Sequence, residues 1–155
     1  MGLFDKLIKR FQPPTMEDPY FGKLVYMHVN QDPAKSYWEA EFLFPPTGTT
    51  VFAGLQGGKE GPFPEARDFY LELPDRFEWI MSTVLPSLNQ VFLEWQGRPI
   101  SINPWEDVIL AGFGVEDPTK QPREWDISFE TTTEKWLGII IPFIGDEPQT
   151  PVVDT

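Results

Sequence analysis

The clearest pattern in the chain is an alternation of bulky apolar and polar side chains over residues 37 to 44, YWEAEFLF. Successive side chains of a strand point to opposite faces of a sheet, so this segment predicts a half-buried strand. Its inner face would hold Trp38, Ala40, Phe42 and Phe44. Its outer face would hold Tyr37, Glu39 and Glu41. Two carboxylates on one strand face suggest a catalytic pair, a binding surface or a solvated surface.

Five other segments carry strand patterns, at residues 24–30, 49–55, 106–115, 124–132 and 135–143. In EWDISFETT, Trp125, Ile127 and Phe129 alternate with Asp126, Ser128 and Glu130. This repeats the arrangement of rings on one side and carboxylates on the other. Gly112 and Gly114 interrupt the segment 106–115 and predict a bulge or close packing.

Helical periodicity occupies the middle of the chain. Residues 74–85 and 86–97 each repeat apolar positions at helical spacing, and Asp75 and Ser87 are suitable first-turn caps. Pro86 lies between these segments and predicts two helices separated by a bend. Residues 66–73 fit either a helix or a strand, and the absence of β-branched residues favours the helix.

Residues 1–12 predict a short amphipathic helix that ends at the prolines following Gln12. Its apolar stripe comprises Leu3, Phe4, Leu7, Ile8 and Phe11. The stripe would dock on the protein's own domain, on a partner chain or on a membrane surface. Three basic residues against Asp5 favour an anionic surface, but an isolated helix of this length is marginal. Docking on a protein is therefore the preferred interpretation, and peripheral membrane contact by residues 1–11 is the alternative.

The order of these elements predicts an α+β fold with the arrangement β-β-β-α-α-β-β-β after the N-terminal helix. We expect a largely antiparallel sheet of about six strands, with the helical segment packed on one face. One domain would span residues 18–145, and the polar, proline-containing residues 146–155 would form a frayed tail.

Composition narrows the classes of function. The 155 residues include 12 Lys and Arg against 24 Asp and Glu, a net charge of −12, which argues against a nucleic-acid ligand and suits a basic protein partner. The chain has no cysteine, which excludes disulfides and fits a cytoplasmic protein. It also has no apolar run of about twenty residues, so we expect no transmembrane helix.

The residues that could perform chemistry form no recognisable catalytic set. His28 is the only histidine, and Lys59 in the glycine-rich loop precedes Glu60 where a phosphate-binding loop has Ser or Thr. We therefore expect no metal site and no cofactor. Glu39 and Glu41 would lie roughly 7 Å apart on one strand face, a spacing compatible with a carboxylate-based hydrolase. That is the enzymatic alternative.

The two alternating strands predict a shared acidic face if both turn their rings inward. This face would bring Glu39, Glu41, Asp126 and Glu130 together with Tyr26, His28 and Tyr37. Carboxylates steer a basic partner, and tyrosine offers contact area at low entropic cost. Trp105, beside Glu106 and Asp107, is a second candidate contact, or alternatively a plug at the end of the sheet.

Four segments, DPYFGKLVY, YWEAEFLF, EWDISFETT and WLGIIIPF, follow one another from about residue 18 to residue 145. In order and spacing the chain resembles small bacterial α+β domains of unknown function. Some domains of this kind are immunity proteins encoded beside bacterial toxins. The resemblance implies binding rather than catalysis and supplies no catalytic residues.

We therefore expect a cytoplasmic protein that is not an enzyme and that binds another protein. The concrete form of the hypothesis is an immunity-type inhibitor of a bacterial toxin acting through the acidic face. The alternatives are a carboxylate-based hydrolase and a structural or assembly protein recruited by its N-terminal helix.

Overall fold

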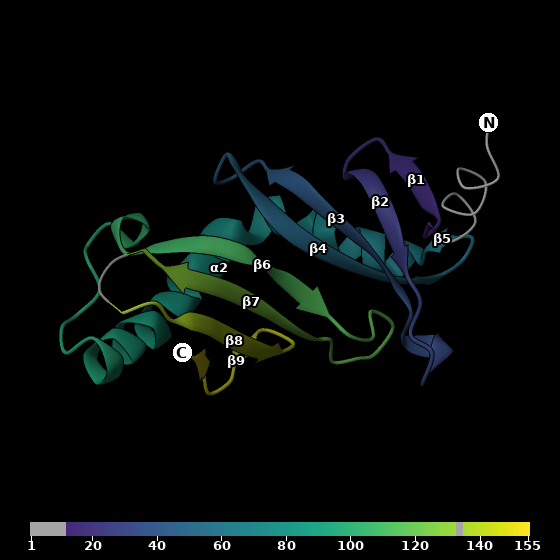
Figure 1. The fold of residues 1–155 in the computed structure, drawn as a ribbon. Helices are drawn as coiled ribbons and strands as arrows, with labels where there is room; N and C mark the ends of the chain where they lie inside the picture. The colour runs from purple at the N-terminus through teal and green to yellow at the C-terminus, as the bar shows by residue number, and fades with distance from the viewer. Residues whose placement is uncertain (1–11, 133–134) are drawn as a thin grey trace.

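The computed structural model describes residues 12–132 and 135–155, and in them a mixed sheet packs against one long helix (Figure 1). The helix, α2, spans Pro64–Trp95, and two 3-10 turns, η1 and η2, span Pro33–Lys35 and Pro104–Glu106. The strands are β1 Thr15–Asp18, β2 Gly22–Met27, β3 Tyr37–Phe44, β4 Thr49–Gly58, β5 Gly61–Pro62, β6 Val108–Val115, β7 Glu124–Thr131, β8 Gly138–Ile144, β9 Glu147–Pro148 and β10 Val152–Asp154.

The described strands form one ten-stranded sheet in which the main order is β1-β2-β3-β4-β6-β7-β8-β10. The short strands β5 and β9 pair with β4 and β8. The pairings are antiparallel except between β4 and β6, where only Phe52–Gly112 and Ala53–Phe113 are in parallel register. Helix α2 connects these two strands, so the sheet consists of two antiparallel halves joined by a short parallel seam. The α+β class and the largely antiparallel sheet are therefore confirmed.

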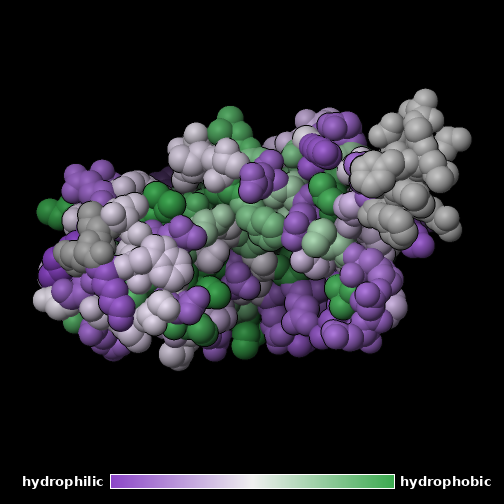
Figure 2. Space-filling view, in the orientation of Figure 1, coloured by the Kyte–Doolittle hydropathy of each residue, from purple (hydrophilic) through white to green (hydrophobic). Residues whose placement is uncertain are grey.

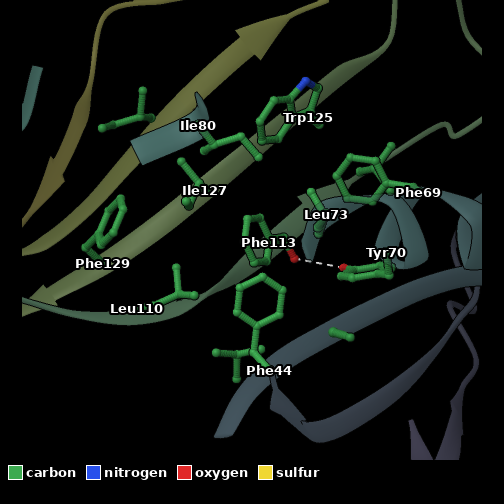
Figure 3. Close-up of a cluster of buried hydrophobic side chains, with 14 of the residues drawn as sticks. Phe44, Phe69, Tyr70, Leu73, Ile80, Leu110, Phe113, Trp125, Ile127 and Phe129 are labelled. Carbon is green, nitrogen blue, oxygen red and sulfur yellow. Dashed lines mark hydrogen bonds between the residues drawn. The ribbon is translucent and has the colours of Figure 1, made fainter. Parts of the chain in front are cut away.

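Helix α2 covers one face of the sheet, and no helix of the described residues lies over the other face (Figure 1). Ten of its side chains are buried at helical spacing, beginning at Ala66 and ending at Phe92. They meet the inward-facing side chains of the strands, among which Trp38, Phe44, Phe129 and Phe143 are almost completely buried. Figure 3 shows part of this core, where Phe69, Leu73 and Ile80 of α2 lie among Phe113, Trp125 and Ile127.

The prediction of two helices separated at Pro86 was wrong, because α2 continues through both Pro74 and Pro86. Each proline removes one backbone hydrogen bond and costs about 3 kcal/mol in a helix interior. Burial of a large apolar side chain contributes about 1.5–3 kcal/mol, and the buried stripe runs unbroken across both prolines. Packing on the sheet therefore outweighs the local cost. Residues 66–73, whose pattern fits either a helix or a strand, are helical, in agreement with the preference for a helix.

The sheet is larger than the predicted six strands. The additional strands are β1, β5, β9 and β10. Residues 146–155 were expected to form a frayed tail, but they contain two paired strands. Val152–Asp154 pairs with Gly138–Ile140 of β8, and Glu147–Pro148 pairs with the other end of β8. β-Branched Val152 and Val153 suit this pairing, and they satisfy backbone groups of β8 that would otherwise face water.

The predicted N-terminal helix, with its docking residues Leu3, Phe4, Leu7, Ile8 and Phe11, lies outside the described residues apart from Gln12. Within the ranges 12–132 and 135–155, the model contains no helix that combines the length and apolar character needed to cross a membrane.

The parallel seam is completed by a side chain of α2. The hydroxyl of Tyr70, whose side chain is fully buried, lies 3.1 Å from both the N and the O of Gly54 and 2.9 Å from the carbonyl oxygen of Phe113 (Figure 3). It accepts from the Gly54 N–H and donates toward the two carbonyls. Burial raises the pKa of Tyr70, which keeps this donor protonated. The hydroxyl thus satisfies backbone groups where the ladder between β4 and β6 stops.

Candidate functional site

We call the sheet surface opposite α2 the open face. It is more apolar than the acidic face that the sequence predicts. Figure 2 shows it in the orientation of Figure 1: apolar residues gather along its middle, and hydrophilic residues gather at the end where η1 and the β6–β7 loop lie. Leu43 is 64% exposed and Phe52 is 42% exposed. Other exposed apolar side chains of this face are Ile109, Ile140, Ile144 and Val152. An exposed apolar patch of this kind marks a candidate interaction surface.

The predicted carboxylates lie on this face in two rows. Glu39 and Glu41 lie on β3 and Asp126 and Glu130 on β7, while the intervening ring residues of both strands are buried on the α2 side. Strands β4 and β6 lie between the rows, which are therefore about 14 Å apart, or three inter-strand spacings. Phe52 and Ile109 lie on these intervening strands, whereas Leu43 lies on β3 and Ile140, Ile144 and Val152 lie beyond β7. The acidic residues are therefore interspersed with apolar side chains and do not form one continuous patch.

The other predicted contact residues are divided between the two faces. Tyr37 lies on the open face and donates a hydrogen bond of 3.2 Å to Glu39. Burial, and then the charge of Glu39, raises the pKa of Tyr37, so its hydroxyl remains a donor. Tyr26 was placed on the wrong face, because it pairs with Trp38 in register and its ring packs 5.1 Å from that indole in the core. Val25 and Met27 face outward in its place.

Two further candidates lie away from the carboxylates. His28 follows the end of β2, is exposed, and has its Nδ1 3.5 Å from the Oγ of Ser36. Trp105, in η2, stacks on Phe77 of α2 with ring centroids 6.2 Å apart and also approaches Phe129. Both of these partners belong to the core layer, so the structure places Trp105 at the end of the sheet and not among the open-face carboxylates.

Asp126 lines a cavity on the open face, and the sequence did not predict this cavity. Its volume is about 440 Å³, and its lining includes Tyr37, Phe52, Gly54, Gly114 and Asp126. We call it the Asp126 cavity. An adjoining depression of about 740 Å³ shares Lys35, Gln56, Glu116 and Asp126 with it and extends toward β8. Together they hollow the hydrophilic end of the open face.

The glycines of β6 explain how this cavity forms. A Cβ atom on Gly114 would lie 3.0 Å from Oδ2 of Asp126, so the carboxylate rests directly over the bare backbone of β6. A Cβ atom on Gly112 would lie 2.7 Å from the carbonyl oxygen of Phe52, so β4 approaches there more closely than any side chain allows. The register also shifts between Leu110 and Gly112. The bulge and the close packing expected of these glycines are both present, the bulge beside Gly112 and the close packing at Gly112 and Gly114.

Burial raises the pKa of Asp126 to about 6, well above the ordinary value for an aspartate. The carboxylate accepts no hydrogen bond and forms no ion pair within the described residues. A charge held in this way is unfavourable for folding, and strongly perturbed ionisable groups in clefts are candidates for functional sites. Asp126 is thus the most distinctive ionisable group of the open face.

Replacing Asp126 with asparagine is expected to stabilise the protein above pH 6. The folded pKa exceeds the unfolded one, so stability of the wild type falls as pH rises through that interval, whereas the variant does not titrate. The difference in unfolding free energy should reach about 1–2 kcal/mol near pH 8, after allowing for water that still reaches the carboxylate, and should vanish near pH 4. Urea denaturation at both pH values measures it. A wild type more stable than the variant at pH 8 contradicts the prediction.

The hydrolytic alternative gains no support from the position of its carboxylates. Glu41 is exposed and Glu39 is half-buried, and neither lines the Asp126 cavity or the depression beside it. No group of three or more His, Asp or Glu side chains in the described part of the chain is arranged to hold a metal ion.

Comparison with known proteins gives no match: no family model, no curated protein and no solved structure is similar to this chain.

Proposed function

We propose that the protein binds a basic partner protein through the open face and catalyses no reaction itself. The observation that carries the proposal is the composition of that face, where two separate rows of carboxylates are interspersed with exposed apolar side chains. Stable interfaces combine an apolar centre with a polar rim, and complementary charge gives them specificity and fast association.

The charges of the open face indicate that its partner is basic. Lys35 is 3.4 Å from Glu116, and Lys120 is 2.8 Å from Glu124, so these cations are already paired with carboxylates. Glu39, Glu41, Asp126 and Glu130 have no ion-pair partner among the described residues. With a net charge of −12 over the whole chain, the face favours a cationic surface. An immunity-type inhibitor that blocks a basic toxin is the concrete form of the proposal.

The proposal is tested by reversing the charge of one row. A photo-crosslinking residue at Leu43 on the open face, with Leu93 of α2 as the control position, identifies the partner, which is then purified. The variant E39K/E41K should bind it about 10- to 100-fold more weakly and with a shallower salt dependence. The control E65K/E78K makes the same change in net charge at exposed positions of α2 and should bind like the wild type.

Two results contradict the proposal. One is crosslinking from Leu93 and not from Leu43. The other is an equal loss of affinity in E39K/E41K and E65K/E78K, because that outcome would show a dependence on net charge alone.

A further inference from the structure

We infer that the Asp126 cavity receives the guanidinium group of an arginine side chain. The inference rests on the proposed function only for the carrier of that side chain, which would be the basic partner protein. The cavity itself is defined by the geometry of this chain. Its volume of about 440 Å³ lies within the range of ligand-binding pockets.

The floor of the cavity consists of backbone without side chains. Gly54 of β4 and Gly114 of β6 lie on either side of the parallel seam, and both line the cavity. A Cβ atom on Gly54 would contact the rings of Phe52 and Tyr37 at 3.7 Å, so these two rings stand beside the floor. On the opposite side, the carboxylate of Asp126 lies over Gly114. The cavity therefore has an aromatic wall and an anionic wall, with a backbone floor between them.

These walls match the two recognition modes of arginine. A carboxylate accepts two parallel N–H bonds from the planar guanidinium fork, and aromatic faces attract the same cation. Gln56 adds an acceptor, because its Nε2 donates to the carbonyl of Ala34 and its Oε1 is left without a donor among the described residues. An ammonium group can reach Asp126 but cannot use the planar fork or stack as well, so arginine is favoured over lysine.

The charges at the rim do not oppose this ligand. The ion pair Lys35–Glu116 is internally neutral, which leaves Asp126 as the net charge among the residues that line the cavity. The adjoining depression adds the neutral pair Lys120–Glu124 and the carboxylates of Asp32 and Asp117, which also favour a cation. A bound guanidinium would supply the partner that the Asp126 carboxylate lacks within the described chain. Binding would thus relieve the unfavourable charge that folding leaves in this position.

The site should depend on pH, because only the carboxylate form of Asp126 accepts the guanidinium. Burial raises the pKa of Asp126 to about 6, so affinity should increase as pH rises through that value. The charged and titratable groups that line the cavity or the adjoining depression with Asp126, or approach it through the floor, are Asp32, Lys35, Tyr37, Tyr70, Glu116, Asp117, Lys120 and Glu124. The pKa values of both tyrosines are raised, so they stay neutral in this range, and the change is assigned to Asp126, whose pKa lies within it.

The test is an NMR titration of the full chain with Nα-acetyl-L-arginine methylamide, a single arginine side chain without charged ends. Saturable shifts are expected at the amides of Gly54, Gly114 and Asp126, with millimolar affinity. D126N should bind about 10-fold more weakly, because it loses charge-assisted hydrogen bonds worth about 1.5 kcal/mol or more. G54A, which places a methyl group on the floor, should also bind more weakly. E78Q removes an exposed carboxylate from α2, on the other face of the sheet, and should bind like the wild type.

The contradicting results are specific to this inference. The assignment is overturned by the absence of saturable shifts, by equal binding to D126N, or by a lysine analogue that binds as tightly as the arginine one. The variant E39K/E41K separates this inference from the proposed function. If it binds the arginine probe and the partner as the wild type does, the proposed role of the β3 carboxylates is contradicted and the assignment of the cavity stands. Both proposals are supported if D126N binds the arginine probe more weakly and E39K/E41K binds the partner more weakly.

Discussion

Replacing Asp107 with alanine is expected to lower the free energy of unfolding by about 3–5 kcal/mol, because it removes a buried carboxylate that is hydrogen-bonded to Arg98 and Ser101. Asp107 is 3% exposed and receives two hydrogen bonds from Arg98, at 2.8 and 3.0 Å, and one from the N–H of Ser101 at 2.7 Å. These bonds tie the segment after α2 to the start of β6. Urea denaturation near pH 7 measures the loss.

The contribution of Asp107 to stability should also depend on pH in the acidic range. The hydrogen bonds from Arg98 lower the pKa of Asp107, so its folded pKa lies below its unfolded pKa. Its contribution is complete above the unfolded value, near pH 4, and declines as the solution becomes more acidic. D107A should therefore lose less stability in acid than the wild type does. The control D75A alters an exposed aspartate of α2 that makes no hydrogen bond or ion pair with the described residues, and it should change stability by less than about 0.5 kcal/mol. A loss below about 1 kcal/mol for D107A would contradict the argument.

Replacing Gly112 with alanine is expected to destabilise the protein by about 3 kcal/mol, since it forces apart the two halves of the sheet. The new methyl group would lie 2.7 Å from the carbonyl oxygen of Phe52, a backbone atom that cannot move without breaking the seam. Beyond this seam, the Tyr70 hydroxyl is the bridge between β4 and β6, so its hydrogen bonds should weaken as well. Thermal or urea denaturation measures the effect.

Gly54 supplies the matched control for this prediction. It lies on the adjacent strand, and the nearest atoms to its added Cβ are ring carbons at 3.7 Å, an ordinary contact. G54A should be neutral or more stable by up to about 1 kcal/mol, because alanine loses less backbone entropy than glycine on folding. If G112A and G54A have equal stability, the close approach at Gly112 does not limit the fold.

Local patterns carried much of this fold. YWEAEFLF predicts a strand over residues 37–44, and β3 has the same bounds with the same inner and outer faces. The phase of residues 24–30 could not be read in this way, because both of its faces carry apolar side chains, and only pairing with Trp38 turns Tyr26 inward. Likewise, the proline at position 86 predicts a break that an uninterrupted stripe of buried side chains overrides. The apolar stripe is also visible in the sequence, and it indicated the continuous helix more reliably than the proline indicated a break.

The Asp126 cavity depends on contacts between distant residues, which local patterns do not encode. Asp126 meets Gly114 because β7 pairs with β6, and both meet Phe52 and Gly54 because β6 inserts beside β4 after a crossover of about fifty residues. The sequence marked the two glycines of β6 as unusual but gave no indication of which side chain would cover them. The carboxylates of β3 and β7 were correctly assigned to one face, but the two intervening strands that separate them were not foreseen.

The outermost strands of the sheet limit how another chain can join it. In the described residues, β1 has four residues and follows two prolines, and β10 has three and follows Pro151. Such short borders offer few free backbone groups, so they are poor templates for the addition of a further strand and for aggregation. Recognition by this molecule should then be directed by side chains, which makes it sensitive to single substitutions and insensitive to the partner's capacity to form extended structure.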